Sequence, residues 1–267
     1  MKKITKRTSS KKNTRRNAPI QKGKNWKKDK IKSKEEILNC LDEFNKHQKQ
    51  KDYGHRVQFQ HWHKRNIRKL CDFIKSPFCY KQRFLPLYHC LSSSKPLQER
   101  QRLTLCKVVS VLLLFTEAEH NQIGICKADE MDCVTHESLI KMYQAVFGEE
   151  ISKGRWTRAI KQLKMIDAIH IDAAYLAKED QDNPENPTQI RSVAAMKVFN
   201  SSFFTMIGVN HLTDVLVSIK RSIEERLKKG LSNVWMSYKK HVVKRIPAIE
   251  PPFSAPIPDY YNESLIH

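Results

Sequence analysis

The segment from Leu103 to Phe115 is apolar at every position except Thr104, Lys107 and Ser110. A helix that is apolar around its whole circumference has to be surrounded by other elements. At 13 residues the segment is also too short to span a bilayer, which takes about 20 residues. The sequence therefore predicts a central buried helix, and the rest of the chain must supply the elements that cover it.

A regular series of patterns follows this helix. Ile123–Cys126 and Met131–Val134 have the composition of short strands. Thr135 and Ser152 are predicted N-caps of two amphipathic helices, and Gly148 and a tight turn over 149–151 separate these helices. The stretches Ile169–Ala177 and Ile190–Phe199 predict a β-hairpin with a long tip. A winged helix-turn-helix domain has this same order of elements: helix, short strand, helix, turn, helix and hairpin. We therefore expect a mainly α (α+β) fold with such a domain over 97–211.

Further helices are predicted on both sides of this domain. Residues 34–96 form a helical region, in which Ser33 and Glu36 match a capping box and a second helix runs from about His63 to Lys75. Their predicted buried residues are Ile37, Leu41 and Phe44 in the first helix, and Ile67, Leu70, Cys71 and Ile74 in the second. Residues 212–245 predict two amphipathic helices, the first with Leu212, Leu216, Ile219, Ile223 and Leu227 on one face and the second starting at Leu231. Residues 246–267 hold five prolines and predict an extended tail.

The chain is strongly basic, with 49 Lys and Arg against 28 Asp and Glu, a net charge of +21. Residues 1–34 hold 15 of the basic residues and a single acid, Asp29. We expect residues 1–33 to form a disordered basic arm that adds affinity for a polyanion without reading sequence. Arg15 and Arg16 are the candidate phosphate-binding residues of this arm. The alternative is a solubilising or targeting tail.

The helix predicted over 152–164 has the two faces that a DNA-recognition helix needs. Trp156, Ala159, Ile160 and Leu163 share one arc, which is suited to packing against the domain. The other positions are basic or able to form hydrogen bonds, and no acidic residue lies between Ser152 and Ile166. Arg, Lys and Gln are side chains that read base edges in the major groove or bind phosphate. The candidate DNA-binding residues are Lys153, Arg155, Thr157, Arg158, Lys161, Gln162 and Lys164. The alternative is an ordinary solvated helix face.

The tip of the predicted hairpin is acidic, with Glu179, Asp180, Asp182 and Glu185. A phosphate backbone would repel these four acids. We therefore expect the tip to point away from DNA or to contact a protein.

Enzymatic motifs are sparse. The chain lacks a Walker-type glycine-rich loop, a nucleophile elbow and a zincin motif, so we expect no enzymatic activity and no cofactor. Cys71, Cys79, His89 and Cys90 lie near one another in sequence without the short spacing of a zinc knuckle, so we expect no metal. His61-Trp62-His63 would suit a metal-dependent nickase if it lay on a strand, but the charged residues after it favour two exposed histidines at the start of a helix. Seven scattered cysteines and no signal peptide predict a reduced, cytoplasmic protein.

Residues 68–209 resemble the RepA replication initiators of IncFII- and IncL/M-like plasmids. The similarity lies in Lys69–Ile74, in Leu97–Leu103 leading into the apolar helix, and in the stretch Ser152–Leu163 with its continuation to His170. The resemblance implies a bacterial protein that binds the double-stranded DNA of a plasmid origin, recruits the host initiator or helicase, and has no membrane partner. It makes Arg155 and Arg158 the best candidates for base or phosphate contact, and homodimers are possible. The family often ends in a long Arg-rich region, which this chain lacks.

Three other functions stay open at this point. A winged-helix transcriptional regulator would use the same helix. A metal-dependent nickase would use His61 and His63. An RNA-binding protein would account for the charge alone.

Overall fold

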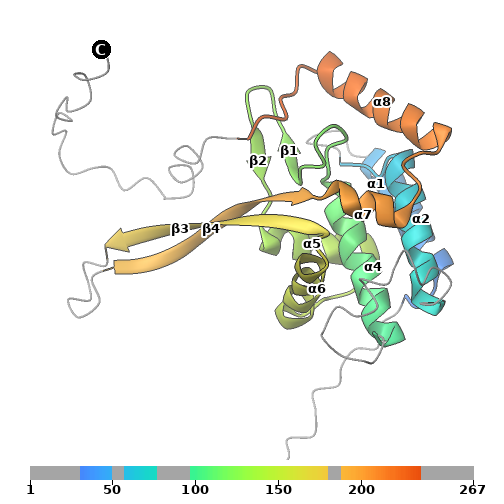
Figure 1. The fold of residues 1–267 in the computed structure, drawn as a ribbon, viewed down its shortest axis with the longest axis horizontal. Coiled ribbons are helices and arrows are strands. Elements are labelled where there is room, and N and C mark those ends of the chain that lie inside the picture. Colours follow the sequence, from blue (N-terminus) through green and yellow to red (C-terminus); the bar gives the residue numbers. More distant parts are fainter. Residues whose placement is uncertain (1–30, 50–56, 77–96, 180–187, 236–267) are drawn as a thin grey trace, which may run out of the picture. The chain divides into compact units, whose positions relative to one another are not determined.

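The computed structural model describes residues 31–49, 57–76, 97–179 and 188–235 (Figure 1), all of which belong to one compact unit. This part of the chain is mainly helical, with two small antiparallel sheets, as predicted. Its elements are α1 Lys34–Lys49, α2 His61–Lys75, α4 Glu99–Leu114, β1 Gly124–Cys126, β2 Met131–Cys133, α5 His136–Phe147, α6 Lys153–Met165, β3 Ile169–Glu179, β4 Thr188–Phe199, α7 Ser201–Ile207 and α8 Thr213–Lys228. Residues 1–30, with Arg15 and Arg16, and the tail over 246–267 lie outside the described residues.

Helix α4 is the centre of the fold, as its apolar sequence predicts. Every residue from Arg102 to Leu114 is buried. Helices α2, α5 and α6 pack against it, and Figure 1 shows α4 between α2 on one side and α5 and α6 on the other. No helix of the described part combines the length and the apolar character needed to cross a membrane.

Lys107, which interrupts the apolar run of α4, has a buried acidic partner. Its Nζ lies 2.7 Å from Glu149 Oε2 and donates to the Ile31 carbonyl at 2.9 Å. Glu149 Oε1 in turn accepts from the Ile31 N–H at 2.6 Å. Two charges taken out of water need this complete pairing, because an unpartnered buried charge costs several kcal/mol. The pair therefore ties Ile31, which precedes α1, to the turn between α5 and α6.

The predicted caps are confirmed. The Ser33 and Glu36 side chains each bond the other's backbone N–H, at 3.1 and 3.2 Å, which closes the capping box of α1. Thr135 caps α5 by accepting from the Ser138 N–H at 3.0 Å, and Ser152 caps α6 by accepting from the Arg155 N–H at 3.3 Å. Helix α2 begins at His61, two residues before the predicted start.

Gly148 and Gly124 fill positions that other residues would fit poorly. Gly148 ends α5 with a left-handed φ of 60°, which glycine adopts without a Cβ penalty. In β1, a Cβ on Gly124 would lie 2.6 Å from the Asp132 carbonyl oxygen of β2. The two strands can approach this closely only because residue 124 has no side chain.

The predicted hairpin over 169–199 is present, and the two predicted short strands near 124 and 131 pair with each other as a further hairpin. In the shorter hairpin, Gly124 pairs with Cys133 and Cys126 with Met131. The longer hairpin runs from the pair Ile169–Phe199 to the pair Glu179–Thr188, with an irregularity between Asp172 and Ala174. The order α4, β1–β2, α5, α6 and β3–β4 is the predicted order. The acidic positions 180, 182 and 185 lie outside the described residues.

The second C-terminal helix is predicted wrongly at its start. After α8, Gly230 turns the chain with a φ of 61°. Ser232 then bridges to Lys127 and Trp235 to Met131, so residues 231–235 extend along the β1–β2 hairpin. The Ser232 N–H donates to the Lys127 carbonyl at 2.7 Å, and the Met131 N–H donates to the Val234 carbonyl at 2.6 Å. These bonds along the sheet edge outweigh the amphipathic pattern that predicted a helix.

Candidate nucleic-acid interface

Helix α6 exposes one continuous basic face. Trp156, Ala159, Ile160 and Leu163 are buried, as predicted. The basic face consists of Lys153, Thr157, Arg158, Lys161 and Lys164, all of which are exposed. At about 100° per residue these five side chains span about 140° of the helix surface. That arc also contains Gly154 and Met165 and no acidic residue, so its charge is entirely positive.

Two predicted DNA-binding residues do not belong to this face. Gln162 is only 2% exposed, so the prediction that it faces outward is wrong. Arg155 is half-buried, and its guanidinium donates to Thr104 Oγ1 of α4 at 2.7 Å. Both residues lie on the side of α6 that faces α4. The 3.6-residue period gave the width of the polar arc but not which part of it the neighbouring helix covers.

Trp156 fixes how α6 sits on α5. Its side chain is buried, and its Nε1 donates to His136 Nδ1 at 3.0 Å. The pKa of His136 lies below its ordinary value, mainly through loss of hydration and secondly through the positive charge of Lys197, although part of the side chain stays exposed. The neutral ring can accept the indole hydrogen bond, whereas a charged ring could not. His136 therefore positions α6, and Thr135 caps α5.

A shallow groove of about 340 Å³ separates the start of α5 from α6 and adjoins the basic face. Lys153 and Thr157 line it from α6, and His136 and Glu137 line it from α5. Glu137 is paired with Lys141 at 3.1 Å, and this hydrogen bond lowers the pKa of Glu137. The only acid that lines the groove is therefore offset by a neighbouring lysine, and the positive side chains of α6 stay dominant.

The β3–β4 hairpin leaves directly from the end of α6. Asp167 turns the chain with a φ of 54°, and the Ala168 N–H donates to the Leu163 carbonyl at 2.9 Å. Asn200, just after β4, donates to the Asp167 carbonyl at 2.6 Å. These bonds hold both ends of the hairpin against the C-terminus of α6, so helix and hairpin form one unit.

The two histidines of His61-Trp62-His63 lie in α2 and not on a strand. Residues two apart on a helix are separated by about 200°, so these rings point to different sides. His61 is exposed and lies 3.0 Å from Asp214 Oδ2. His63 is buried, which corrects the prediction that both are exposed. In the described part of the chain no three His, Cys, Asp or Glu side chains are grouped to hold a metal ion.

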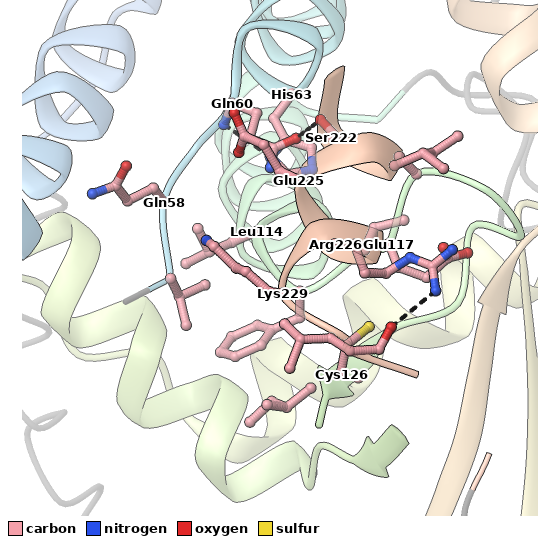
Figure 2. A pocket seen from close by; sticks show the side chains of 18 residues that line it. Gln58, Gln60, His63, Leu114, Glu117, Cys126, Ser222, Glu225, Arg226 and Lys229 are labelled. Carbon is pink, nitrogen blue, oxygen red and sulfur yellow. Dashed lines mark hydrogen bonds between the residues drawn. The ribbon is translucent and has the colours of Figure 1, made fainter. Parts of the chain in front are cut away.

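A second hollow of about 210 Å³ lies between α2, the end of α4, β1 and α8. Figure 2 shows Gln60, His63 and Ser222 close together on one side of it, with Glu117 and Arg226 on another. Burial lowers the pKa of His63 to about 3, against a smaller opposing effect of the Thr116 carbonyl, and burial also raises the pKa of the Cys126 thiol. Both groups are therefore uncharged near neutral pH, and neither has the charge state of a general acid or a reactive thiolate.

A comparison of the chain with protein-family models, with curated proteins and with solved structures finds no match.

Proposed function

We propose that this protein is a plasmid replication initiator that binds double-stranded origin DNA sequence-specifically through a winged helix, with α6 as its recognition helix. One observation carries the proposal: α6 follows α5 and a tight turn, precedes a β-hairpin, and exposes a basic face without a single acid. This is the arrangement in which a helix-turn-helix protein lays its second helix in the major groove.

The size and chemistry of the basic face support this docking. The 13 residues of α6 make a helix about 20 Å long, and the major groove is wide enough to admit one helix. Arg158 has a planar guanidinium that can bond guanine O6 and N7 together. Lys153, Lys161 and Lys164 suit phosphate oxygens, which fix the register of a protein on the duplex. We assign base reading to Arg158 and positioning to the three lysines.

The first-turn location of Lys153 adds to this electrostatic picture. The backbone N–H groups at the start of a helix favour anions, and α6 carries no acid in its first turn to compete for them. Arg15 and Arg16, with the other basic residues before Ile31, would add contacts to phosphate that carry no sequence information.

The initiator role, as opposed to that of a transcriptional regulator, rests on the resemblance to RepA initiators. This resemblance also implies a bacterial cytoplasmic location, a host initiator or helicase as partner, and no catalytic step by this chain. A regulator would use the same basic face, so the two roles differ in where the bound DNA lies. Footprinting on DNA that flanks the protein's own gene separates them, because an initiator protects an origin and supports replication of a plasmid that carries it.

The binding experiment compares Arg158→Ala with Lys46→Ala, a variant that removes one exposed positive charge from α1 instead. On the protected duplex we expect Arg158→Ala to lose about 1–3 kcal/mol of binding free energy, the worth of a bidentate base contact. Lys46→Ala should change the affinity little. Equal affinities of Arg158→Ala and the unmodified protein for this duplex would contradict the role of α6.

A further inference from the structure

Gly154 is an exposed glycine in the first turn of α6, within the arc of the basic face. At about 100° per residue it lies within about 30° of the middle of that arc. Glycine weakens a helix relative to alanine, because it loses more backbone freedom on folding. A glycine at this position therefore needs a compensating reason, either within the fold or in a complex.

The fold does not require a glycine at position 154. Gly148, Gly208 and Gly230 have φ angles of 60°, 70° and 61°, which suit glycine, and a Cβ on Gly124 would collide with the neighbouring strand. Gly154 has a helical backbone, and a Cβ added to it would meet no atom within 4 Å beyond the adjoining backbone of α6. Among the glycines of the described ranges, Gly154 is thus the one that neither backbone conformation nor packing explains.

Small and long side chains alternate around the first two turns of the basic face in a specific way. Around the helix axis, Thr157, Gly154 and Arg158 follow Lys153 at about 40°, 100° and 140°. The two long cationic side chains, Lys153 and Arg158, therefore stand at the edges of the face, and the two small residues lie between them. This arrangement leaves a depression along the middle of the face, with positive charge on both rims.

The dimensions of a major groove give this depression a use. An α-helix with its side chains is about 10–12 Å across and the groove is about 12 Å wide, so a recognition helix enters it with little clearance. The N-terminal residues of such a helix contact the base edges. A side chain at position 154 would meet the floor of the groove first and would hold the backbone of α6 away from the bases.

We propose that Gly154 is a positioning residue that lets the first turns of α6 approach the base edges of the duplex closely. The inference rests on the proposed function, because it takes α6 as the recognition helix. The close approach brings in Thr157, whose side chain is short and exposed. Its hydroxyl can bond a base edge, and its methyl group can contact a thymine methyl, only when the helix backbone lies deep in the groove. The longer side chain of Arg158 depends less on this depth.

Substitutions of Gly154 should change stability and DNA binding in opposite directions. Gly154→Ala should raise the Tm of the free protein by about 1–3 °C, because alanine favours the helix and a Cβ meets no obstacle there. On the duplex that the protein protects in footprinting, fluorescence anisotropy should show binding about tenfold weaker for Gly154→Leu, and a smaller loss for Gly154→Ala. Binding to a random duplex should change less than about twofold, because it depends on phosphate contacts.

Met165→Leu is the matched control. Met165 is 47% exposed and lies within the same arc of α6, about three turns further along the helix. Leucine there replaces a side chain of similar size, so the affinity for the protected duplex should change less than about twofold. Circular dichroism checks that the variants keep their helices. A loss of affinity in Gly154→Leu alone therefore reports added bulk at position 154 and not an added leucine on the face.

A double-mutant cycle tests whether Gly154 acts through the depth of the helix. Thr157→Ala should weaken binding to the protected duplex by about fivefold in the unmodified background, but by less than about twofold in Gly154→Leu, whose helix no longer brings residue 157 to the bases. Equal affinities of Gly154→Leu and the unmodified protein, or the same effect of Thr157→Ala in both backgrounds, would overturn the proposal, while Arg158→Ala still reports separately on α6. An unmodified protein that does not prefer the protected duplex would overturn the proposed function and this inference together.

Discussion

At the scale of single residues, the buried pair of Lys107 and Glu149 is the most consequential contact. The pair lies in the core, is only 2.7 Å apart, and holds both backbone polar groups of Ile31. The sequence signals it only through a lysine within an apolar run, which requires a buried acid without indicating which one. Glu149 and Glu150 are adjacent in the predicted turn, and only the packing of the turn against α4 selects Glu149.

Glu149→Gln should lower the free energy of unfolding by about 3–5 kcal/mol, because glutamine can still accept from Ile31 but leaves the Lys107 ammonium without a buried counter-charge. Urea unfolding at neutral pH measures this. Glu150→Gln, at an exposed neighbouring site, should stay within about 0.5 kcal/mol of the unmodified protein. Similar small effects of the two substitutions would show that the pair does not stabilise the fold.

His63 gives the stability a pH dependence. Its pKa is about 3 in the folded protein and near 6.5 when unfolded, so the unfolded chain binds the extra proton between these values. The contribution of neutral His63 is complete above pH 6.5 and falls by about 1.4 kcal/mol per pH unit as the solution is acidified toward pH 3. Unfolding at pH 7 and pH 5 should show this loss, and His63→Asn should have a flatter profile. An unchanged slope in the variant would contradict the assignment.

At the scale of elements, the parts of the fold that depend on local rules are the parts the sequence predicts. Ser33 with Glu36, Thr135, Gly148 and Ser152 cap helices at the predicted positions because a cap needs only its own neighbours in sequence. The buried arc of α6 follows in the same way from the helical period.

Features that depend on distant neighbours are not predictable in this way. The Arg155 guanidinium donates to Thr104, which is remote in sequence. Leu216 and Leu227 of α8 are exposed, and the opposite side of the helix bonds Trp62 and Gln60 through Ser218 and Ser222. Residues 231–235 pair with a hairpin and do not form the predicted helix. In each case a contact between separate elements determines the conformation or the exposure of the residues. The periodicity of a single segment contains no information about such a contact.

The cap of α6 allows stability and DNA binding to be separated. Ser152→Ala should cost about 1 kcal/mol in the free energy of unfolding, whereas Ser152→Asp should keep the cap and the stability. The aspartate would nevertheless place a negative charge at the start of the basic face, so we expect Ser152→Asp to bind DNA more weakly than Ser152→Ala. Thermal unfolding and fluorescence anisotropy measure the two effects. Stronger DNA binding by the aspartate variant would contradict an interface at the start of α6.

At the scale of the whole molecule, the charge divides into two parts for which we propose different roles. Residues 2–29 contribute twelve Lys and Arg against the single acid Asp29, whereas the basic face of α6 contributes four positive side chains in a fixed arrangement. Positive charge by itself raises affinity for any nucleic acid, and only charge held on a rigid element can select a sequence. Ile31, held by Lys107 and Glu149, is the first described residue that is tied to the core.

Deletion of residues 2–29 should therefore weaken binding to specific and random duplexes by the same factor. The dependence of log K on log salt concentration should become shallower, by about 0.9 for each phosphate that the shortened protein no longer neutralises. Titrations at several salt concentrations measure both. Weaker binding to the specific duplex alone would assign sequence reading to the arm and not to α6.

Selection of bound duplexes from a random library tests most directly whether the basic face of α6 reads DNA sequence. We expect the unmodified protein to enrich a defined sequence. The double variant R158A/K161A should lose this enrichment while still folding and retaining weak binding to all duplexes. Recovery of the same sequence with the same affinity by both proteins would contradict sequence reading by α6, as would the absence of any enriched sequence for the unmodified protein.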